Sequence, residues 1–297
     1  MLKNILTNEA IKALYKKRTY ISFILLTFLV PLIILAIGDG AEYMESRIYG
    51  QLKDSFIVIG SITNGYLSSY LIIAILISQM PFLSTIVASE IVSGEYSKGT
   101  FRMYLSRSVS RNKILFSKFV IVQIYTILMM LFFVFYTLII GCLMLGVGDL
   151  AVFHKGLLFL PQEDIVWRFF IAFIVSTLVM IATSSLCFML STIYKNSVTP
   201  IIITISAVFI GSAISFIPIP LFEAINPFLF TGYIDLFLAA FFDPVPWDVI
   251  IEATFVCLIW YGIFTISAFY LLNRKEIMSL INISEPTRLR QISYAVL

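Results

Sequence analysis

Six long apolar runs alternate with shorter polar segments along the chain. A helix of about 20 apolar residues is long enough to cross the hydrocarbon core of a bilayer. The runs lie at residues 19–37, 66–88, 114–146, 167–194, 198–217 and 249–272. The run at 114–146 is the longest, and because it contains no turn signal we interpret it as one tilted or protruding helix. The pattern predicts an all-α integral membrane protein with six transmembrane helices.

The segment before the first run has a different periodicity. Its apolar residues at positions 2, 5, 6, 10 and 13 fall on one face of a helix, and its lysines lie largely on the other side. We therefore expect residues 1–18 to form an amphipathic helix at the membrane surface. A signal peptide is the alternative, since cations precede an apolar run. The run at 19–37 is longer than an ordinary signal sequence and lacks a clean small-x-small cleavage site, which favours the amphipathic helix.

The composition is that of a membrane protein. The 297 residues are 60% hydrophobic and 12% charged, whereas soluble domains carry about 25% charged residues. The three cysteines, Cys142, Cys187 and Cys257, each lie inside an apolar run. They indicate neither a disulfide framework nor a metal site, and we interpret them as small apolar residues.

Lysine and arginine concentrate in alternate polar segments. Of the 20 in the chain, five precede the first run, six lie between the second run and the start of the third when Lys118 in its first turns is included, one lies between the fourth and fifth, and four follow the sixth. The other segments carry most of the acids. The positive-inside rule therefore predicts that both termini are cytoplasmic. The expected parts are the helix at 1–18, the transmembrane domain at 19–272 and a cytoplasmic tail at 273–297.

The sequence lacks the residue patterns that several classes of transporter and enzyme require. No run carries an ionisable residue near its middle, where proton-coupled carriers usually place one. The one histidine, His154, lies in an outer segment, and no G-x-S-x-G elbow occurs. Gly60 and Gly65 have the spacing of a phosphate loop, but Tyr66 stands where a lysine is needed. We therefore expect no enzyme activity in this chain, and any ATP that drives it must be bound by another polypeptide.

The segment SEIVSGEYSKGTFRMYLSRSVSRNKILFSK at 89–118 is the most charged part of the chain interior. On a helix, Phe101, Tyr104 and Leu105 would share one side, and Arg102 and Arg107 would lie elsewhere. This arrangement suits an interface between apolar and wet surfaces. Ser110 is a candidate cap for the third span. The simpler interpretation is that these cations only fix topology and contact lipid phosphates. Topology alone, however, requires neither Glu90 and Glu95 nor a Gly-Thr pair.

This segment resembles the loop motif of ABC-2-type permeases, the membrane subunits of ATP-binding-cassette transporters. The matching positions are Glu95, Gly99, Thr100, Arg102, Leu105, Val109, Ser110, Arg111 and Lys118. One departure is Ser108, where the family commonly has proline. The amphipathic N-terminal helix, the six spans and the longer outer segment before the sixth span also resemble this family.

The resemblance implies that the segment forms a cytoplasmic coupling helix, which docks into a groove of a separate ATPase. The residues expected to carry this coupling are Glu95, Gly99, Thr100, Phe101, Arg102, Tyr104, Leu105, Arg107, Ser110 and Arg111. The implied machine contains two permease copies, or this chain with a paralogue, and two ATPases that bind ATP and Mg. It would export a substrate such as a peptide, antibiotic, lipid or other amphipathic molecule across a bacterial plasma membrane. Membrane lipids are expected partners and nucleic acid is not.

The outer segment from Pro218 to Asp248 is rich in proline and aromatic residues, and its apolar pieces are too short to span. We expect a re-entrant or interfacial helical pair there, or a loop resting on the membrane. The resemblance also places spans two and five near the substrate pathway, for which the candidate residues are Ser78, Gln79, Thr204, Ser212 and Ser215. An ATP-independent channel or secondary carrier is the main alternative, and a membrane enzyme or scaffold is the third.

Overall fold

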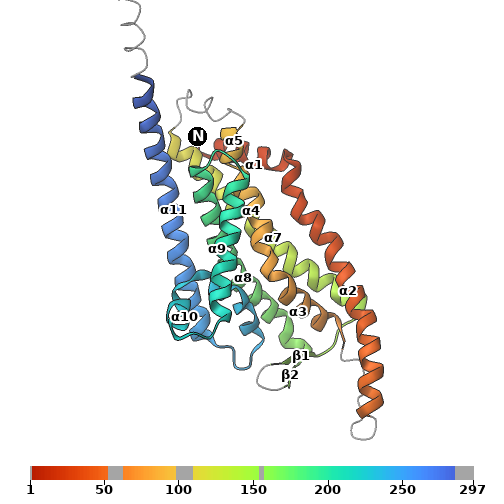
Figure 1. Ribbon diagram of the computed structural model, residues 1–297. Helices are drawn as coiled ribbons and strands as arrows, with labels where there is room; N and C mark the ends of the chain where they lie inside the picture. Colours follow the sequence, from red (N-terminus) through yellow and green to blue (C-terminus); the bar gives the residue numbers. More distant parts are fainter. Residues whose placement is uncertain (1, 53–62, 98–109, 154–156, 285–297) are drawn as a thin grey trace, which may run out of the picture.

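The fold is seen in a computed structural model of the chain, which describes residues 2–52, 63–97, 110–153 and 157–284. Within that part, six helical segments are long and apolar enough to cross a membrane (Figure 1). They are Lys17–Gly40, Gly65–Glu90, Asn112–Leu145, Gln162–Ile193, Val198–Ser215 and Trp247–Arg274. The prediction of a largely helical, multi-pass membrane protein with six such helices is confirmed.

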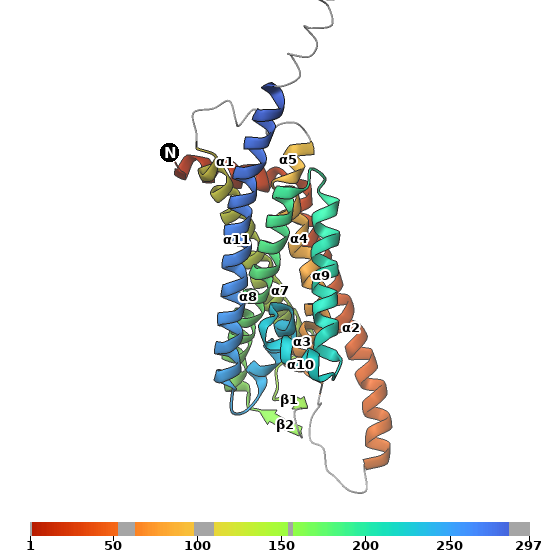
Figure 2. The ribbon, with the colours of Figure 1, turned by 60° about the vertical axis from the view of Figure 1, so that its left-hand side comes forward.

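The chain begins with α1 (Leu2–Tyr15), which lies across one end of the helix bundle (Figures 1 and 2). A sharp corner leads into α2 (Lys17–Leu52), where the Thr19 hydroxyl donates a 2.6 Å hydrogen bond to the Ala13 carbonyl. The helix α2 runs past the apolar run at 19–37 and extends beyond the bundle at the far end (Figure 1). Hydropathy could not mark this extension because its residues are polar.

The second span is broken near its middle. It consists of α3 (Gly65–Leu76), the 3-10 turn η1 (Ile77–Gln79) and α4 (Met80–Glu90). Asn64 caps α3, its side-chain oxygen accepting from the backbone N–H groups of Tyr66 and Leu67. Pro81 accounts for the break, because proline has no N–H to donate and its ring clashes with the carbonyl four residues earlier. A short helix, α5 (Ser93–Ser97), follows α4.

The third span, α7 (Arg111–Leu145), is one uninterrupted helix. It meets α3 at a very close approach, where a Cβ on Gly65 would collide with the backbone of Cys142. The Ser69 hydroxyl donates to the carbonyls of Gly65 and Thr137 at 2.6 and 3.0 Å, which joins the two helices. Small residues allow such contacts between helices in membranes.

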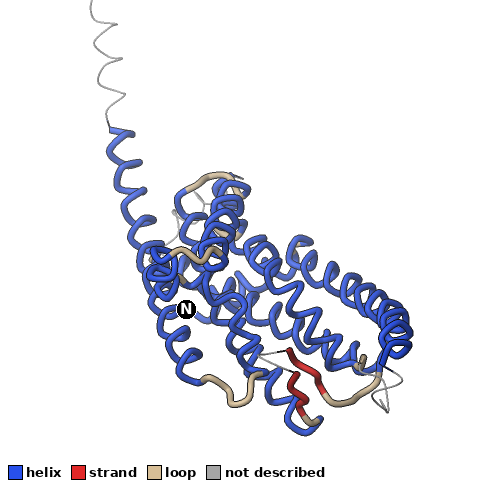
Figure 3. Tube along the Cα trace, turned by 60° about the horizontal axis from the view of Figure 1, so that its bottom comes forward, coloured by secondary structure: helices blue, strands red, loops and turns tan. Residues whose placement is uncertain are grey.

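A two-stranded antiparallel hairpin, β1 (Leu150–Phe153) and β2 (Leu157–Leu160), was not predicted. It lies at the end of the bundle opposite α1 (Figure 1), and its two strands are red in Figure 3. The helix α8 (Gln162–Ile193) comes next and occupies the centre, where it contacts α4, α7, α9 and α11. Serines and threonines on its buried side donate to carbonyls of their own helix, which satisfies their hydroxyls within the apolar core.

The fifth span is α9 (Val198–Phe216). The segment after it forms α10 (Pro220–Ile225), η2 (Asn226–Phe228) and η3 (Phe230–Phe241). The piece formed by α10 and η2 meets η3 at an angle of 79°. The long helix α11 (Trp247–Ser284) completes the described chain, and its C-terminal part reaches the end of the bundle that carries α1 (Figures 1 and 2).

Candidate functional site

The helix α1 presents an acid to the bundle. Its partly buried residues include Ile5, Leu6, Ala10 and Ala13, as the apolar periodicity predicts. Glu9 lies on the same face and is more buried than any of them, with 4% of its surface exposed. A carboxylate placed there has lost most of its hydration, so it needs charged partners from the protein.

A second acid comes from α5. The chain turns sharply after Glu90, and Gly94 is needed at this turn because a Cβ there would lie 2.7 Å from the Cγ of Glu90. This turn directs the buried Glu95 back toward α1 and α7. The Ser97 hydroxyl donates a 3.0 Å hydrogen bond to the Gly94 carbonyl, which closes the single turn of α5 immediately before the segment 98–109.

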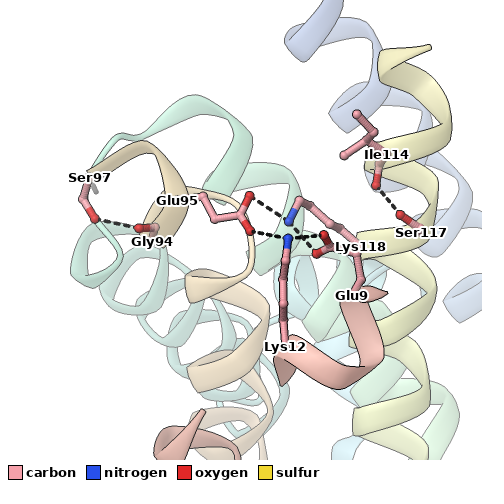
Figure 4. A network of polar contacts seen from close by, with 8 residues as sticks. All are labelled: Glu9, Lys12, Gly94, Glu95, Ser97, Ile114, Ser117 and Lys118. Carbon is pink, nitrogen blue, oxygen red and sulfur yellow. Dashed lines mark hydrogen bonds and ion pairs between the residues drawn. The ribbon is translucent and has the colours of Figure 1, made fainter. Parts of the chain in front are cut away.

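The partner of both acids is Lys118 of α7, which has no exposed surface. Its Nζ lies 2.6 Å from Glu9 Oε2 and 2.8 Å from Glu95 Oε2. Lys12 of α1 faces the same two carboxylates, at 2.7 Å from Glu9 Oε1 and 3.7 Å from Glu95 Oε1. The four side chains thus alternate in sign around a closed ring that joins α1, α5 and α7, which we call the charge ring (Figure 4).

The charges around Glu9 favour its ionised form. Burial alone would raise the pKa of the Glu9 carboxyl, but the positive charges of Lys118 and Lys12 and the hydrogen bonds they donate outweigh it and lower that pKa. The ring is neutral as a set, since two carboxylates face two ammonium groups. A buried ion pair is destabilised strongly when one partner is removed, because the other charge is left uncompensated.

A second ion pair lies next to the ring. Arg18 at the start of α2 and Glu90 at the end of α4 are 3.6 Å apart. Residues of this pair and of the ring line one small cavity of about 20 Å³. The corner between α1 and α2, the end of the second span and the start of the third are therefore joined by one group of charges.

Comparison with known proteins gives a family for the chain. A family model described as "Protein of unknown function (DUF2705)" matches residues 43–234, which is more than half of the chain. The chain belongs to this family. A relative, "Uncharacterized protein YhcI" of Bacillus subtilis (strain 168), is 23% identical over 116 residues. That match covers 38% of this chain and 37% of the relative, so well under two thirds of the relative's length is spanned. Neither description states an activity.

The charge ring crosses the boundary of the region that matches the DUF2705 model. Glu95 and Lys118 lie inside the matched residues 43–234, whereas Glu9 and Lys12 lie before them. The ring therefore attaches the preceding helix α1 to the part of the chain that defines the family.

Of the ten residues expected to couple to an ATPase, few fall in the described part of the DUF2705 chain. Glu95 is a member of the ring. Ser110 occupies the N-cap position of α7, as predicted, but among the described residues its side chain makes no capping hydrogen bond. Arg111 opens that helix. The others, Gly99, Thr100, Phe101, Arg102, Tyr104, Leu105 and Arg107, lie outside the described residues, as does His154.

The five residues proposed for a substrate pathway belong to two elements, η1 and α9. Ser78 and Gln79 are exposed at the η1 break. Thr204 is buried and donates to the Pro200 carbonyl at 2.7 Å, which is an ordinary helix contact. Ser212 is half-buried on α9, and Ser215 donates a 2.6 Å hydrogen bond to Asn226 Oδ1, which ties α9 to η2.

The sequence pattern gives no sign of the contacts that Glu9, Lys12 and Lys118 make in the ring. Lys118 is a matching position of the motif and one of the cations that indicate orientation, but it lies inside α7 and is buried, because two carboxylates neutralise it. Glu9 was not singled out at all. A signal for it did exist, since a lone acid at position 9 falls between apolar positions 5, 6, 10 and 13 on the buried face of α1.

Proposed function

We propose that this chain is the permease subunit of an ATP-binding-cassette exporter of the ABC-2 type. It forms the substrate pathway with a second copy or a paralogue, and it couples to separate ATPases that bind ATP and Mg. The end of the bundle that carries α1 faces the cytoplasm of a bacterial cell, and the six helices cross the plasma membrane. The cargo is a peptide, antibiotic, lipid or other amphipathic molecule.

The observation that carries the proposal is the position of Glu95. It is the first residue of the motif that resembles the ABC-2 coupling loop, and it stands directly before the segment 98–109. The same carboxylate contacts Lys12 of α1 and Lys118 of α7. A partner that moves the segment must therefore move α1 and the third span with it, or separate buried charges at a cost of several kcal/mol.

In this mechanism the charge ring transmits force. ATP-driven closure of two ATPases displaces the segment 98–109, and the ring passes the displacement to α7 and to the α1–α2 corner. The arginines of the segment offer planar donor groups to carboxylates of the ATPase, and Phe101 or Tyr104 anchors the contact. This chain contributes no nucleotide chemistry of its own.

The first experiment is affinity purification of the tagged chain from its native host. We expect an ATPase with Walker motifs to copurify. The substitution Arg102→Glu should reduce its recovery at least about tenfold, since like charges placed across an interface repel strongly. Lys113→Glu is the matched control, because Lys113 is an exposed cation of α7 and is not one of the matching positions of the motif, and it should leave recovery unchanged.

Transport by the same variants distinguishes the alternatives. If no such ATPase copurifies, and cells with Arg102→Glu transport as well as the parent, the coupling role is wrong. An ATP-independent channel or secondary carrier would then explain the fold better.

A further inference from the structure

A second, larger cavity opens beside the charge ring. It has a volume of about 460 Å³ and lies between the start of α2, the end of α4 with α5, and the turn that joins α8 to α9. The ends of α4, α5 and α9 that border it gather at the α1 end of the bundle (Figure 2). Its lining includes the cations Lys16, Lys17 and Arg18 and the polar residues Ser97, Asn196 and Ser197.

The charge of this basic cavity suits an anion. Three consecutive cations face one carboxylate, that of Glu90, which Arg18 approaches at 3.6 Å. The Ser197 hydroxyl and the Asn196 amide group can donate hydrogen bonds to a phosphate oxygen. The cavity also borders the first residue of α9, Val198, so the positive end of that helix dipole adds to the field.

The depth of the basic cavity suits a lipid. Three membrane-spanning segments end at its walls, namely Lys17–Gly40, Gly65–Glu90 and Val198–Ser215. The ends of such segments lie at the level of the phospholipid headgroups. A soluble anion could reach the cavity too, but a ligand that resides in the bilayer is already present at this depth and at high local concentration.

The helices that border the cavity carry exposed apolar side chains. The helix α4 contacts both α2 and α9. Ile24 of α2, Phe82 of α4 and Ile202 of α9 have 55%, 50% and 58% of their surfaces exposed. An acyl chain can lie against these side chains while its headgroup occupies the cavity.

We propose that the basic cavity holds the phosphate headgroup of an anionic phospholipid. The phosphodiester sits among Lys16, Lys17 and Arg18, and the acyl chains extend from the cavity into the bilayer. The bound lipid braces the α1–α2 corner against α5 and α9. The inference does not depend on ATP-driven transport, because any membrane protein with this cavity would bind the same lipid.

The test is native mass spectrometry of the purified full-length chain with phosphatidylglycerol or phosphatidylcholine added. We expect retained phosphatidylglycerol adducts and weak phosphatidylcholine binding. The double substitution Lys16→Gln, Lys17→Gln should weaken phosphatidylglycerol binding roughly 25-fold, at about fivefold for each cation near an anionic headgroup. Lys113→Gln is the control, since it removes an exposed cation at the same end of the bundle but outside the cavity.

A second variant guards against an effect on folding. Ser197→Asp places a negative charge in the cavity at the N-cap of α9, where an acid stabilises a helix. It should lower phosphatidylglycerol binding while the thermal midpoint stays the same or rises. Glycerol phosphate is added as a competitor in the same experiment, which distinguishes a lipid headgroup from a soluble phosphate as the ligand. We expect millimolar glycerol phosphate not to displace the lipid.

Three results would overturn the proposal. The first is equal binding of the two lipids, and the second is equal effects of the cavity and Lys113 substitutions. The third is full displacement by glycerol phosphate, which would make the cavity a site for a soluble anion.

Discussion

Replacement of Lys118 by methionine is the most direct test of the charge ring. Methionine has a similar length and fills the same space, but it leaves Glu9 and Glu95 with Lys12 as their remaining partner in the ring. The ammonium that is lost lies 2.6 and 2.8 Å from the two carboxylates, whereas Lys12 stays 3.7 Å from Glu95. The substitution therefore leaves one buried negative charge without compensation.

The magnitude follows from the burial of the groups. Removing one partner of a buried ion pair costs about 3–5 kcal/mol. Lys12 is 39% exposed and stays 2.7 Å from Glu9, which relieves part of the excess charge. We therefore expect the lower end, about 3 kcal/mol. For a chain of this size the thermal midpoint should fall by on the order of 6 °C.

The assay is thermal unfolding of the purified protein in detergent, together with hydrogen exchange of α1. Lys113→Met is the control, because Lys113 is exposed on the same helix and surface substitutions usually change stability by less than about 0.5 kcal/mol. We expect α1 to exchange faster in Lys118→Met than in the control. Equal midpoints for the two variants, or unchanged protection of α1, would refute the reasoning.

Three further outcomes are expected. The stability that Glu9 contributes should be complete above the ordinary carboxyl pKa of about 4.3 and lost as the pH falls through its lowered pKa. Thermal midpoints measured as a function of pH check this, and Glu9→Gln should make the midpoint depend less on pH. Gly211→Ala should cost about 1–3 kcal/mol, since its Cβ would lie 2.8 Å from Thr231 Cβ. Gly262→Ala, where a Cβ meets nothing within 4 Å, should not lower the midpoint. Arg168→Met should cost roughly 1.5–3 kcal/mol of stability, because Arg168 donates to the carbonyls of Ala240 and Phe242 at 3.2 and 2.6 Å. Asp243 is 3.7 Å from Arg168 and 60% exposed, so Asp243→Asn should hardly change the thermal midpoint.

The six spans could be predicted because the bilayer imposes a length and a polarity that one sequence displays without homologues. The features that were missed are short interruptions that a hydropathy pattern does not register. The break at η1 has a local cause in Pro81, but hydropathy averages over it. The hairpin β1–β2 is short and apolar, so its composition resembles that of the neighbouring spans.

The site was predicted in part for a similar reason. Glu95 was selected through a resemblance in its own segment, and the structure adds partners that are 83 residues earlier and 23 residues later in the chain. Position 9 lies on the apolar face of α1, yet periodicity does not say which helix will meet that face. Pairing of charges across three helices requires the tertiary fold, which a local pattern does not contain.

A neutral version of the ring would separate structure from coupling. Glu9→Gln with Lys118→Met removes one charge of each sign and leaves Lys12 facing Glu95, so the buried excess charge of the single variant disappears. Its midpoint should lie well above that of Lys118→Met, since replacing both members of a buried pair is often nearly neutral. If the ring transmits force from the segment 98–109, this stable variant should still lose ATP-driven transport, because α1 and α7 are no longer held to each other by charge. Transport at the parental rate would restrict the ring to a structural role, and the coupling proposal would then depend on the motif alone.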